Sequence, residues 1–451
     1  MKSAFKYFLL PVLCFSLVWA LILPRWSAQN RDIGQFEILA YLVGLPLGLL
    51  ALGMFASFAW RRRVRRDAEP APQASETAAT VAEAATPARS WQVLATGMVC
   101  AAGANSDEIA GRLAEDLDGI IDLDPMLRNR DGFPIMSARV TTLDDSAVET
   151  WLARRQAVVD PAVQRALALA QTAFDEIVDQ LGPILAAAEV PSLAIHVLAN
   201  DDASNPPLVT DYLEQRARSQ FAKIESLSCE SHEHLDALQT ALEAAAIKGR
   251  ELQLVIAARS SLSENAIDRL DATGQLFSAQ NQHGLIPGEA ACALLLADGD
   301  AYRPHALARV SLPTRTPKPT HAGRIEHRVL AQLLEQSLTT RAIAAESIAA
   351  VYCDTARPGD RAAEAASAMT DVLSHLDPVA QRHNVDALCG ATGMVAPLMA
   401  LALATRATAE SGQPNLVAWL GAPDARAATA VEPIVIASPE PADATAQTQS
   451  A

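Results

Sequence analysis

The sequence predicts a layered α/β fold made of two similar halves and preceded by a two-helix membrane hairpin. Over residues 91–436, stretches with the composition of strands alternate with amphipathic stretches typical of helices. This alternation favours helices packed on a sheet. In each half a predicted helix leads into a strand that ends in an amide or acidic residue, at Ile195–Asn200 and at Ala350–Asp354. Two long apolar runs before residue 66 predict the membrane segments.

The first half begins with a strand from Trp91. The triplet Asn105-Ser106-Asp107 predicts the start of a helix over 108–117, because short polar side chains accept hydrogen bonds from the free N–H groups of a first helical turn. The apolar periodicity of 160–181 predicts a long amphipathic helix. Further predicted elements are a strand at 191–198, a helix at 235–248 that ends before Gly249, and a strand at 252–257.

The second half centres on His283–Leu296, which reads His-Gly-Leu-Ile-Pro-Gly-Glu-Ala-Ala-Cys-Ala-Leu-Leu-Leu. Pro287 and Gly288 predict a turn, at which glycine permits either a positive φ or the close approach of another segment. The apolar run 290–297 suits a strand buried on both faces. The remaining predicted elements are strands at 307–312, 349–352 and 415–419 and helices at 325–338 and 394–404.

The apolar runs 5–23 and 38–60 are each long enough to cross a bilayer. Lys2 and Lys6 lie at the start of the first run, and an arginine cluster at 61–66 follows the second. The positive-inside rule therefore places the N-terminus and everything after residue 66 in the cytoplasm. A cleaved signal peptide is the alternative for the first run, although Trp26-Ser27-Ala28 is a poor cleavage site.

Composition divides the rest of the chain into three parts. Residues 67–90 and 437–451 are rich in Ala, Pro and Thr and poor in large apolar side chains, so we expect a disordered linker and a disordered tail. Between them lies the predicted domain 91–436, with halves of about 91–262 and 263–436.

Charge argues against a nucleic-acid partner. The chain has 36 Lys and Arg and 52 Asp and Glu, of which nine and two lie in residues 1–66. The remainder therefore carries 27 basic and 50 acidic residues, a net charge of −23. Such a surface repels a phosphate backbone.

Few residue patterns point to a site. The six cysteines are scattered without a C-x-x-C pair, which indicates reduced and mostly buried thiols. Cys229, His232 and His234 have a spacing that could bind a metal, but no second half-site is evident, and a solvated turn is the favoured interpretation. No phosphate-binding glycine loop or Gly-x-Ser-x-Gly motif occurs. Four aspartates are expected on surface turns: Asp122, Asp124, Asp144 and Asp145.

Several segments resemble the β-ketoacyl synthases, a family with the thiolase fold, and they follow the order of that family. The clearest is His283–Leu296, which is similar to Gly-Phe-x-Pro-Gly-Glu-Gly-Ala-x-x-Leu-Leu-Leu. The other segments are Thr96–Val99 with Ala102-Gly103, Val255–Leu262, Cys353–Glu364 and Ala391–Leu403. The resemblance implies a thiolase-like αβαβα fold of two halves across about 91–420.

The same resemblance implies that the catalytic set is missing. A condensing enzyme needs a thiolate at a helix N-terminus and two histidines that stabilise negative charge. The family nucleophile corresponds to about His232, with Ser231 and Cys229 nearby, and acidic neighbours would raise the pKa of a thiol there. The two histidine positions fall at Tyr352–Asp354 and Cys389-Gly390, and His383 is six residues away. We therefore expect a degenerate domain with no catalytic, cofactor or metal residue.

Two membrane spans, a tether and a thiolase-like domain resemble a family of accessory proteins of type VI secretion lipase effectors. The segment Arg128–Arg139, Arg-Asn-Arg-Asp-Gly-Phe-Pro-Ile-Met-Ser-Ala-Arg, is part of this resemblance. It implies a non-catalytic adaptor at the bacterial inner membrane that binds a lipase toxin and helps load it onto the secretion spike. The alternatives are an active membrane-tethered 3-oxoacyl-ACP synthase-like enzyme and an immunity protein against a secreted toxin.

Overall fold

The computed structural model describes most of the chain between residues 89 and 434. The described ranges are 89–115, 119–187, 192–199, 205–221, 226–247, 252–298, 302–312, 315–317, 327–357 and 359–434. Within these ranges no helix is long and apolar enough to cross a membrane. The predicted membrane segments 5–23 and 38–60, the linker as far as residue 88 and the tail 437–451 lie outside them.

One group of five strands is formed by the first part of the domain. Its order is β5-β4-β6-β7-β1. Strands β5, β4 and β6 are parallel, and β7 lies antiparallel between β6 and β1. The bounds are β1 Trp91–Cys100, β4 Ser192–Leu198, β5 Ser226–His232, β6 Leu252–Ser260 and β7 Glu289–Asp298. Because β7 belongs to this group, the group extends past residue 262, where the sequence suggested the division between halves.

A second group repeats the first in order and direction. It runs β11-β10-β12-β13-β8, with β11, β10 and β12 parallel and β13 antiparallel between β12 and β8. The two groups join where β8 pairs with β1. The bounds are β8 Ala308–Val310, β10 Val351–Cys353, β11 Arg382–Asn384, β12 Asn415–Trp419 and β13 Ala425–Pro433. The second strand of each group, β4 and β10, is the strand in which the sequence showed an internal echo.

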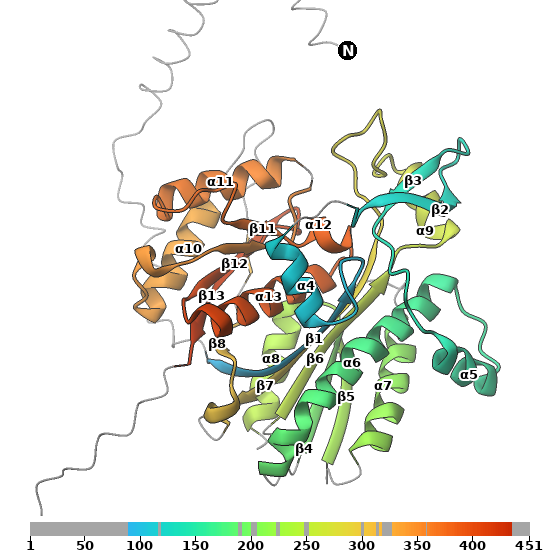
Figure 1. The fold of residues 1–451 in the computed structure, drawn as a ribbon, viewed down its shortest axis with the longest axis horizontal. Coiled ribbons are helices and arrows are strands. Elements are labelled where there is room, and N and C mark those ends of the chain that lie inside the picture. The colour runs from blue at the N-terminus through green and yellow to red at the C-terminus, as the bar shows by residue number, and fades with distance from the viewer. Residues whose placement is uncertain are drawn as a thin grey trace, which may run out of the picture. The chain divides into compact units, whose positions relative to one another are not determined.

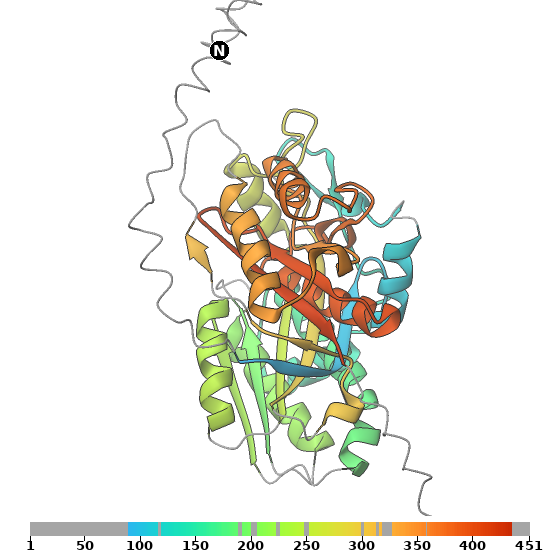
Figure 2. The same cartoon turned by 90° about the vertical axis from the view of Figure 1, so that its left-hand side faces the viewer.

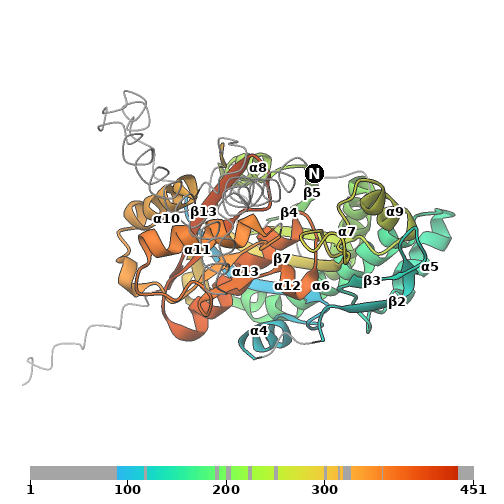
Figure 3. The same ribbon diagram turned by 90° about the horizontal axis from the view of Figure 1, so that it is seen from above.

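Helices cover these strands in three layers. Helices α6 (Pro161–Ala187) and α7 (Pro206–Gln220) pack with strands of the first group in one core, and α10 (Arg328–Arg341) and α11 (Asp360–Val372) pack with strands of the second group in another. Between the two groups, α8 (Leu235–Ile247) and α13 (Val395–Ser411) share a third core with strands of both. Figure 1 and Figure 3 show α13 between α10 and α11 on one side and α6 on the other. The layer order is αβαβα, as the sequence resemblance implied.

Helix α13 shows why this arrangement is stable. Its first part, Val395–Ala404, is apolar on all sides, and residues Val395–Thr405 are all buried. Such a helix has no face suited to water and must be enclosed. Figure 2 shows the orange and red elements of the second half beside the green strands of the first, with this helix at their junction.

The remaining elements surround this framework. They are α4 Ser106–Ala114, β2 Asp122–Arg128, β3 Pro134–Ser137, α5 Ser146–Arg155, α9 Glu264–Ala272, β9 Thr316–Pro317, α12 Asp386–Cys389 and the short 3-10 helices Arg303–His305 and Ala345–Ser347. The predicted cap of α4 is confirmed, since the Asn105 side chain accepts from the backbone N–H of Glu108. Strands β2 and β3 form a separate two-stranded sheet (Figure 1).

One predicted surface position is wrong. Asp124 is buried, and its carboxylate accepts hydrogen bonds from the backbone N–H groups of Met126 and Leu127 and from Ser137 Oγ. Arg139 adds a salt bridge at 2.8 Å. The carboxylate therefore joins β2 to β3 and to the chain after it. The sequence prediction used only the residues next to Asp124 and so could not include these contacts.

Candidate functional site

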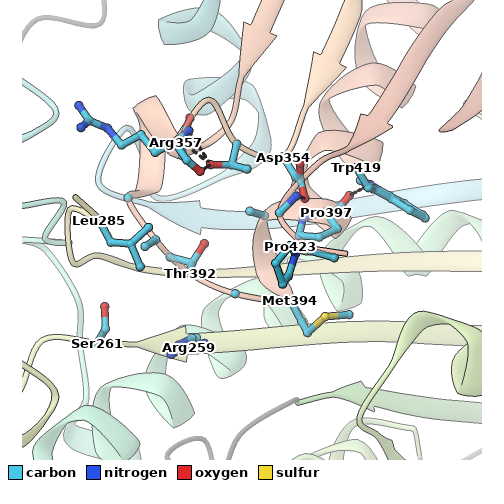
Figure 4. A pocket seen from close by; sticks show the side chains of 18 of the residues that line it. Arg259, Ser261, Leu285, Asp354, Arg357, Thr392, Met394, Pro397, Trp419 and Pro423 are labelled. Atoms are coloured by element: carbon cyan, nitrogen blue, oxygen red, sulfur yellow. Dashed lines mark hydrogen bonds between the residues drawn. The ribbon is translucent and has the colours of Figure 1, made fainter. Parts of the chain in front are cut away.

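A cavity of about 580 Å³ lies between the two strand groups. It is bordered by the start of α8, the end of β6, helix α9, the loops after β10 and β12, and the turn that leads into α13. Figure 4 shows side chains from several of these elements around one opening, among them Arg259, Asp354, Met394 and Trp419. Segments that are far apart in the sequence thus form one site.

The resemblance locates catalytic residues at about His232, at Tyr352–Asp354 and at Cys389-Gly390. His232 itself does not line this cavity. His234, Asp354 and Gly390 all line it. Helix α8 begins directly after His234, because the N–H of Leu238 donates to the His234 carbonyl. Among the described residues that line the cavity, His234 is the one histidine and no cysteine occurs. The cavity therefore carries an imidazole, a carboxylate and a glycine, of which Asp354 and Gly390 stand at positions that the resemblance gives and His234 lies two residues after the third position.

Asp354 stands at the end of β10 and is fully enclosed. Its two carboxylate oxygens accept hydrogen bonds from the backbone N–H groups of Leu420 at 2.7 Å and Gly421 at 3.0 Å. Burial raises the pKa of this carboxyl to about 6, although these N–H groups act in the opposite direction. Because both oxygens are engaged by the loop after β12, this carboxylate fixes the wall of the cavity.

Asp386, the first residue of α12, has a similar role. It accepts hydrogen bonds from Thr355 Oγ1 and from the backbone N–H groups of Ala356 and Arg357 at 2.9–3.2 Å. Burial raises the pKa of the Asp386 carboxyl as well. The guanidinium of Arg357 lies over the ring of Phe277 and donates to the carbonyl of Gln282. The chain after β10 is thus held to both sides of the cavity.

The stretch His283–Leu296 contributes Leu285 to the cavity lining and continues into a buried strand. Glu289, the first residue of β7, is buried, and its carboxylate accepts from the N–H of Val140, from Ser260 Oγ and from Arg165. These partners belong to the chain before α5, to β6 and to α6. The predicted buried strand is confirmed, and its first residue joins three segments.

Cys229, the thiol nearest to the expected nucleophile position, does not reach the cavity. Its Sγ donates to the carbonyl of Thr210 at 3.6 Å, so the side chain lies on the α7 side of β5. Burial raises the pKa of the thiol to about 12, and Glu214, Glu230 and Asp211 add to the shift. The direction agrees with the sequence prediction, but two of the three carboxylates come from α7, which was not predicted. The described cysteines are free, and all but Cys229 are buried, as expected.

Basic side chains predominate on the cavity lining. Its arginines are Arg259, Arg269, Arg315, Arg357 and Arg426, against two aspartates that are already bonded to backbone N–H groups. Arg426 is buried and paired with Glu364 at 2.7 Å. The cavity therefore has a basic character within a domain of strongly acidic composition.

The structure does not bring together the three residues of the metal-binding pattern found in the sequence. His232 does not combine with Cys229 and His234; its Nε2 lies 3.0 Å from Nδ1 of His196, and Glu230 is the third member of the cluster. The sequence offered no sign of this because β5 is polar and its pairing with β4 was not predicted. The cluster faces the layer of α8, on the side of β5 opposite to Cys229.

Solved ketosynthase structures match this fold. A β-ketoacyl synthase from Burkholderia phymatum STM815 superimposes with a TM-score of 0.53 at 13% identity, over 77% of this chain and 100% of that one. The ketosynthase from module 1 of the bacillaene synthase of Bacillus amyloliquefaciens FZB42 gives 0.55 at 14% identity, over 79% and 74% of the two chains. The ishigamide ketosynthase/chain length factor gives 0.56 at 13%, over 77% and 99%.

The chain has a thiolase-like fold. At these identities the likeness shows the fold alone. No family model matches the sequence, and no curated protein sequence does. What the site does must therefore be argued from its own residues.

Proposed function

We propose that this protein is a non-catalytic ketosynthase-like adaptor that binds a type VI secretion lipase effector and helps load it onto the secretion spike. The observation that carries the proposal is the cavity lined by His234, Asp354 and Gly390. In this proposal the thiolase-like fold is kept, while the side chains that would perform condensation are replaced.

The chemistry of the site supports a binding role. Carbon–carbon bond formation on a thioester needs a thiolate nucleophile and donors that stabilise an oxyanion. Cys229, the thiol nearest in sequence to the expected nucleophile position, lies on the far side of β5, and burial raises its pKa to about 12. Cys389, the last residue of α12, is fully buried, and burial raises the pKa of its thiol as well. Asp354 cannot donate to an oxyanion as an imidazole does, because its oxygens already accept from the loop after β12.

Exposed hydrophobic side chains on β2 and β3 support a protein partner. Three large apolar residues of this small sheet and its turn are open to solvent: Leu123 at 55%, Met126 at 79% and Phe133 at 66%. Across the described residues only three others are comparably exposed: Val158, Ile247 and Val379. All three belong to this one two-stranded sheet and its turn, and exposed apolar surface of this kind is typical of a protein interface. Phe133 also falls within the segment 128–139 that resembles the adaptor family.

The proposed anchor gives the adaptor a location. In this proposal the segments 5–23 and 38–60 span the bacterial inner membrane, and the domain faces the cytoplasm. The segment between the anchor and the domain then confines a bound toxin close to the membrane-embedded secretion machinery. Confinement raises the effective concentration of the toxin at its export site without any further contact.

Co-purification from cells tests the adaptor role. The full-length chain is expressed with a lipase effector and a spike protein of the same genome, and the complex is isolated through the effector. We expect the wild-type chain to be retained and Met126→Ser or Phe133→Ser to reduce retention at least tenfold. Val379→Ser is the matched control, since Val379 is also 79% exposed but lies on another part of the domain. Equal retention of all variants, or none of the wild type, would contradict the proposal.

Two further measurements separate the alternatives. Acyl and malonyl thioesters offered to the purified protein would yield a condensed product if the domain were a synthase. A reporter fused at the C-terminus would show on which side of the membrane the domain lies. An immunity protein against a periplasmic lipase requires the periplasmic side, whereas the adaptor requires the cytoplasm.

A further inference from the structure

We propose that His196, Glu230 and His232 form a binding site for a divalent transition-metal ion, with Zn²⁺ as the ion that fits the donor set. The site lies on the first strand group, at the pairing of β4 with the edge strand β5. It is separate from the cavity described above, whose lining includes none of the three residues.

Parallel pairing of the two strands brings the ligands together. His196 is the register partner of Glu230, and Leu198 is the partner of His232. Residues two apart on a strand point to the same face. Glu230 and His232 therefore lie beside His196 on the face that carries Leu198, in the core shared with α8. Cys229 points to the opposite face.

The distances are close to those of a metal site. His196 Nδ1 and His232 Nε2 are 3.0 Å apart, and the potential ligand atoms of all three residues lie within 4.8 Å of one another. Two nitrogens bound to Zn²⁺ at tetrahedral angles stand roughly 3.3 Å apart. The rings need to separate by a few tenths of an ångström. Glu230 is exposed, so its side chain can rotate toward the ion.

The donor types select the ion. Two imidazole nitrogens and one carboxylate oxygen suit Zn²⁺ and other late transition metals, whereas Mg²⁺ and Ca²⁺ prefer oxygen ligands. His196 is 2% exposed and fixed by the sheet, while His232 is half-buried. The exposed side near Glu230 leaves room for water as a fourth ligand.

Direct hydrogen bonding between two neutral imidazoles would also place the nitrogens 3.0 Å apart. Such a bond does not involve the Glu230 carboxylate, whereas a metal ion bound by the two imidazoles would take that carboxylate as its third ligand. Bound metal would connect the edge strand β5 to β4 and so stabilise the end of the sheet, because ligands from both strands would be held by one ion.

The test uses the full-length protein purified without a histidine tag. Zn²⁺ is titrated against the protein with a chromogenic chelator as competitor, and Co²⁺ serves as a spectroscopic probe. We expect one equivalent of Zn²⁺ to bind with a micromolar or tighter Kd and to raise the melting temperature. Co²⁺ should give the intense visible bands of a four-coordinate site.

Variants identify the ligands. Glu230→Gln and His232→Gln should each weaken Zn²⁺ binding at least tenfold. Since Glu230 is exposed, its variant keeps the fold, which circular dichroism verifies. His305→Gln, an exposed histidine on a distant 3-10 helix, should bind as the wild type does.

The sequence pattern of Cys229, His232 and His234 provides the competing ligand set. If Cys229→Ser or His234→Gln abolished binding while Glu230→Gln left it unchanged, the proposed site would be wrong. Failure of the wild-type protein to bind Zn²⁺ or to shift its melting temperature would also overturn the proposal.

Discussion

The backbone of Gly288 lies directly against the carbonyl group of Cys389. A Cβ atom added to Gly288 would stand 1.9 Å from that oxygen and 3.1 Å from Cβ of Ala138. The sequence allowed two reasons for a glycine after Pro287, a positive φ or a close approach, and the structure shows the close approach. This contact seats the start of β7 against α12, immediately before the Gly390 turn that lines the cavity.

Gly288→Ala is expected to destabilise the domain by about 3 kcal/mol, because backbone atoms must move apart to admit the methyl group. Urea unfolding of the two proteins measures the change. Gly111→Ala serves as control, since nothing lies within 4 Å of its added Cβ on α4. The control should be neutral or more stable by about 0.5–1 kcal/mol. Similar stability of both variants would show that the Gly288 contact is not tight.

Glu289→Gln is expected to lower the free energy of unfolding by about 3 kcal/mol, because it leaves the Arg165 guanidinium without its buried counter-charge. Chemical unfolding monitored by tryptophan fluorescence checks the value. Glu214→Gln is the matched control: Glu214 pairs with Arg218 on the exposed side of α7, where such a pair contributes about 0.3–0.5 kcal/mol. A loss at Glu289 no larger than that of the control would contradict the structural role given to this carboxylate.

Cys229 is expected to resist alkylation in the folded protein. A thiol with a pKa of about 12 is almost entirely protonated at pH 8, and the thiolate is the reactive form. Iodoacetamide followed by peptide mass spectrometry should modify Cys229 at least a hundredfold more slowly in the folded state than in urea. Rapid modification of the folded protein would show an activated thiol and favour a catalytic role.

His383 is expected to make stability depend on pH. Its ring packs beside that of Tyr352, and burial lowers its pKa. As the pH falls below about 6.5, the unfolded chain takes up a proton that the folded ring does not, so folding loses free energy. Between pH 7.5 and 5.5 the wild-type melting temperature should fall more than that of His383→Gln. An equal fall in both proteins would be inconsistent with a buried neutral imidazole.

Many helices and strands of the domain could be predicted from the composition of their own residues. The apolar runs of β7 and α13, the cap at Asn105 and the amphipathic pattern of α6 each fix an element through its own residues. Strand β5 was missed because Ser226–His232 is polar, and its place at a sheet edge comes from pairing with β4. Without β5, neither the neighbour of His196 nor the direction of Cys229 could be derived.

The candidate site was predictable in outline only. The resemblance gave positions near His232, Asp354 and Gly390, of which Asp354 and Gly390 line one cavity together with His234. The sequence could not show that His234 lines the cavity while His232 pairs with His196. That distinction depends on the register of two strands and on where α8 begins.

Thioester chemistry tests the central claim most directly. The purified protein is incubated with an acyl thioester and then with a malonyl thioester, and both the intact protein mass and the released product are measured. We expect no acyl adduct and no condensed product, because none of the described residues that line the cavity is a cysteine. An acyl adduct on any cysteine together with a condensed product would contradict the account and identify the protein as an active synthase.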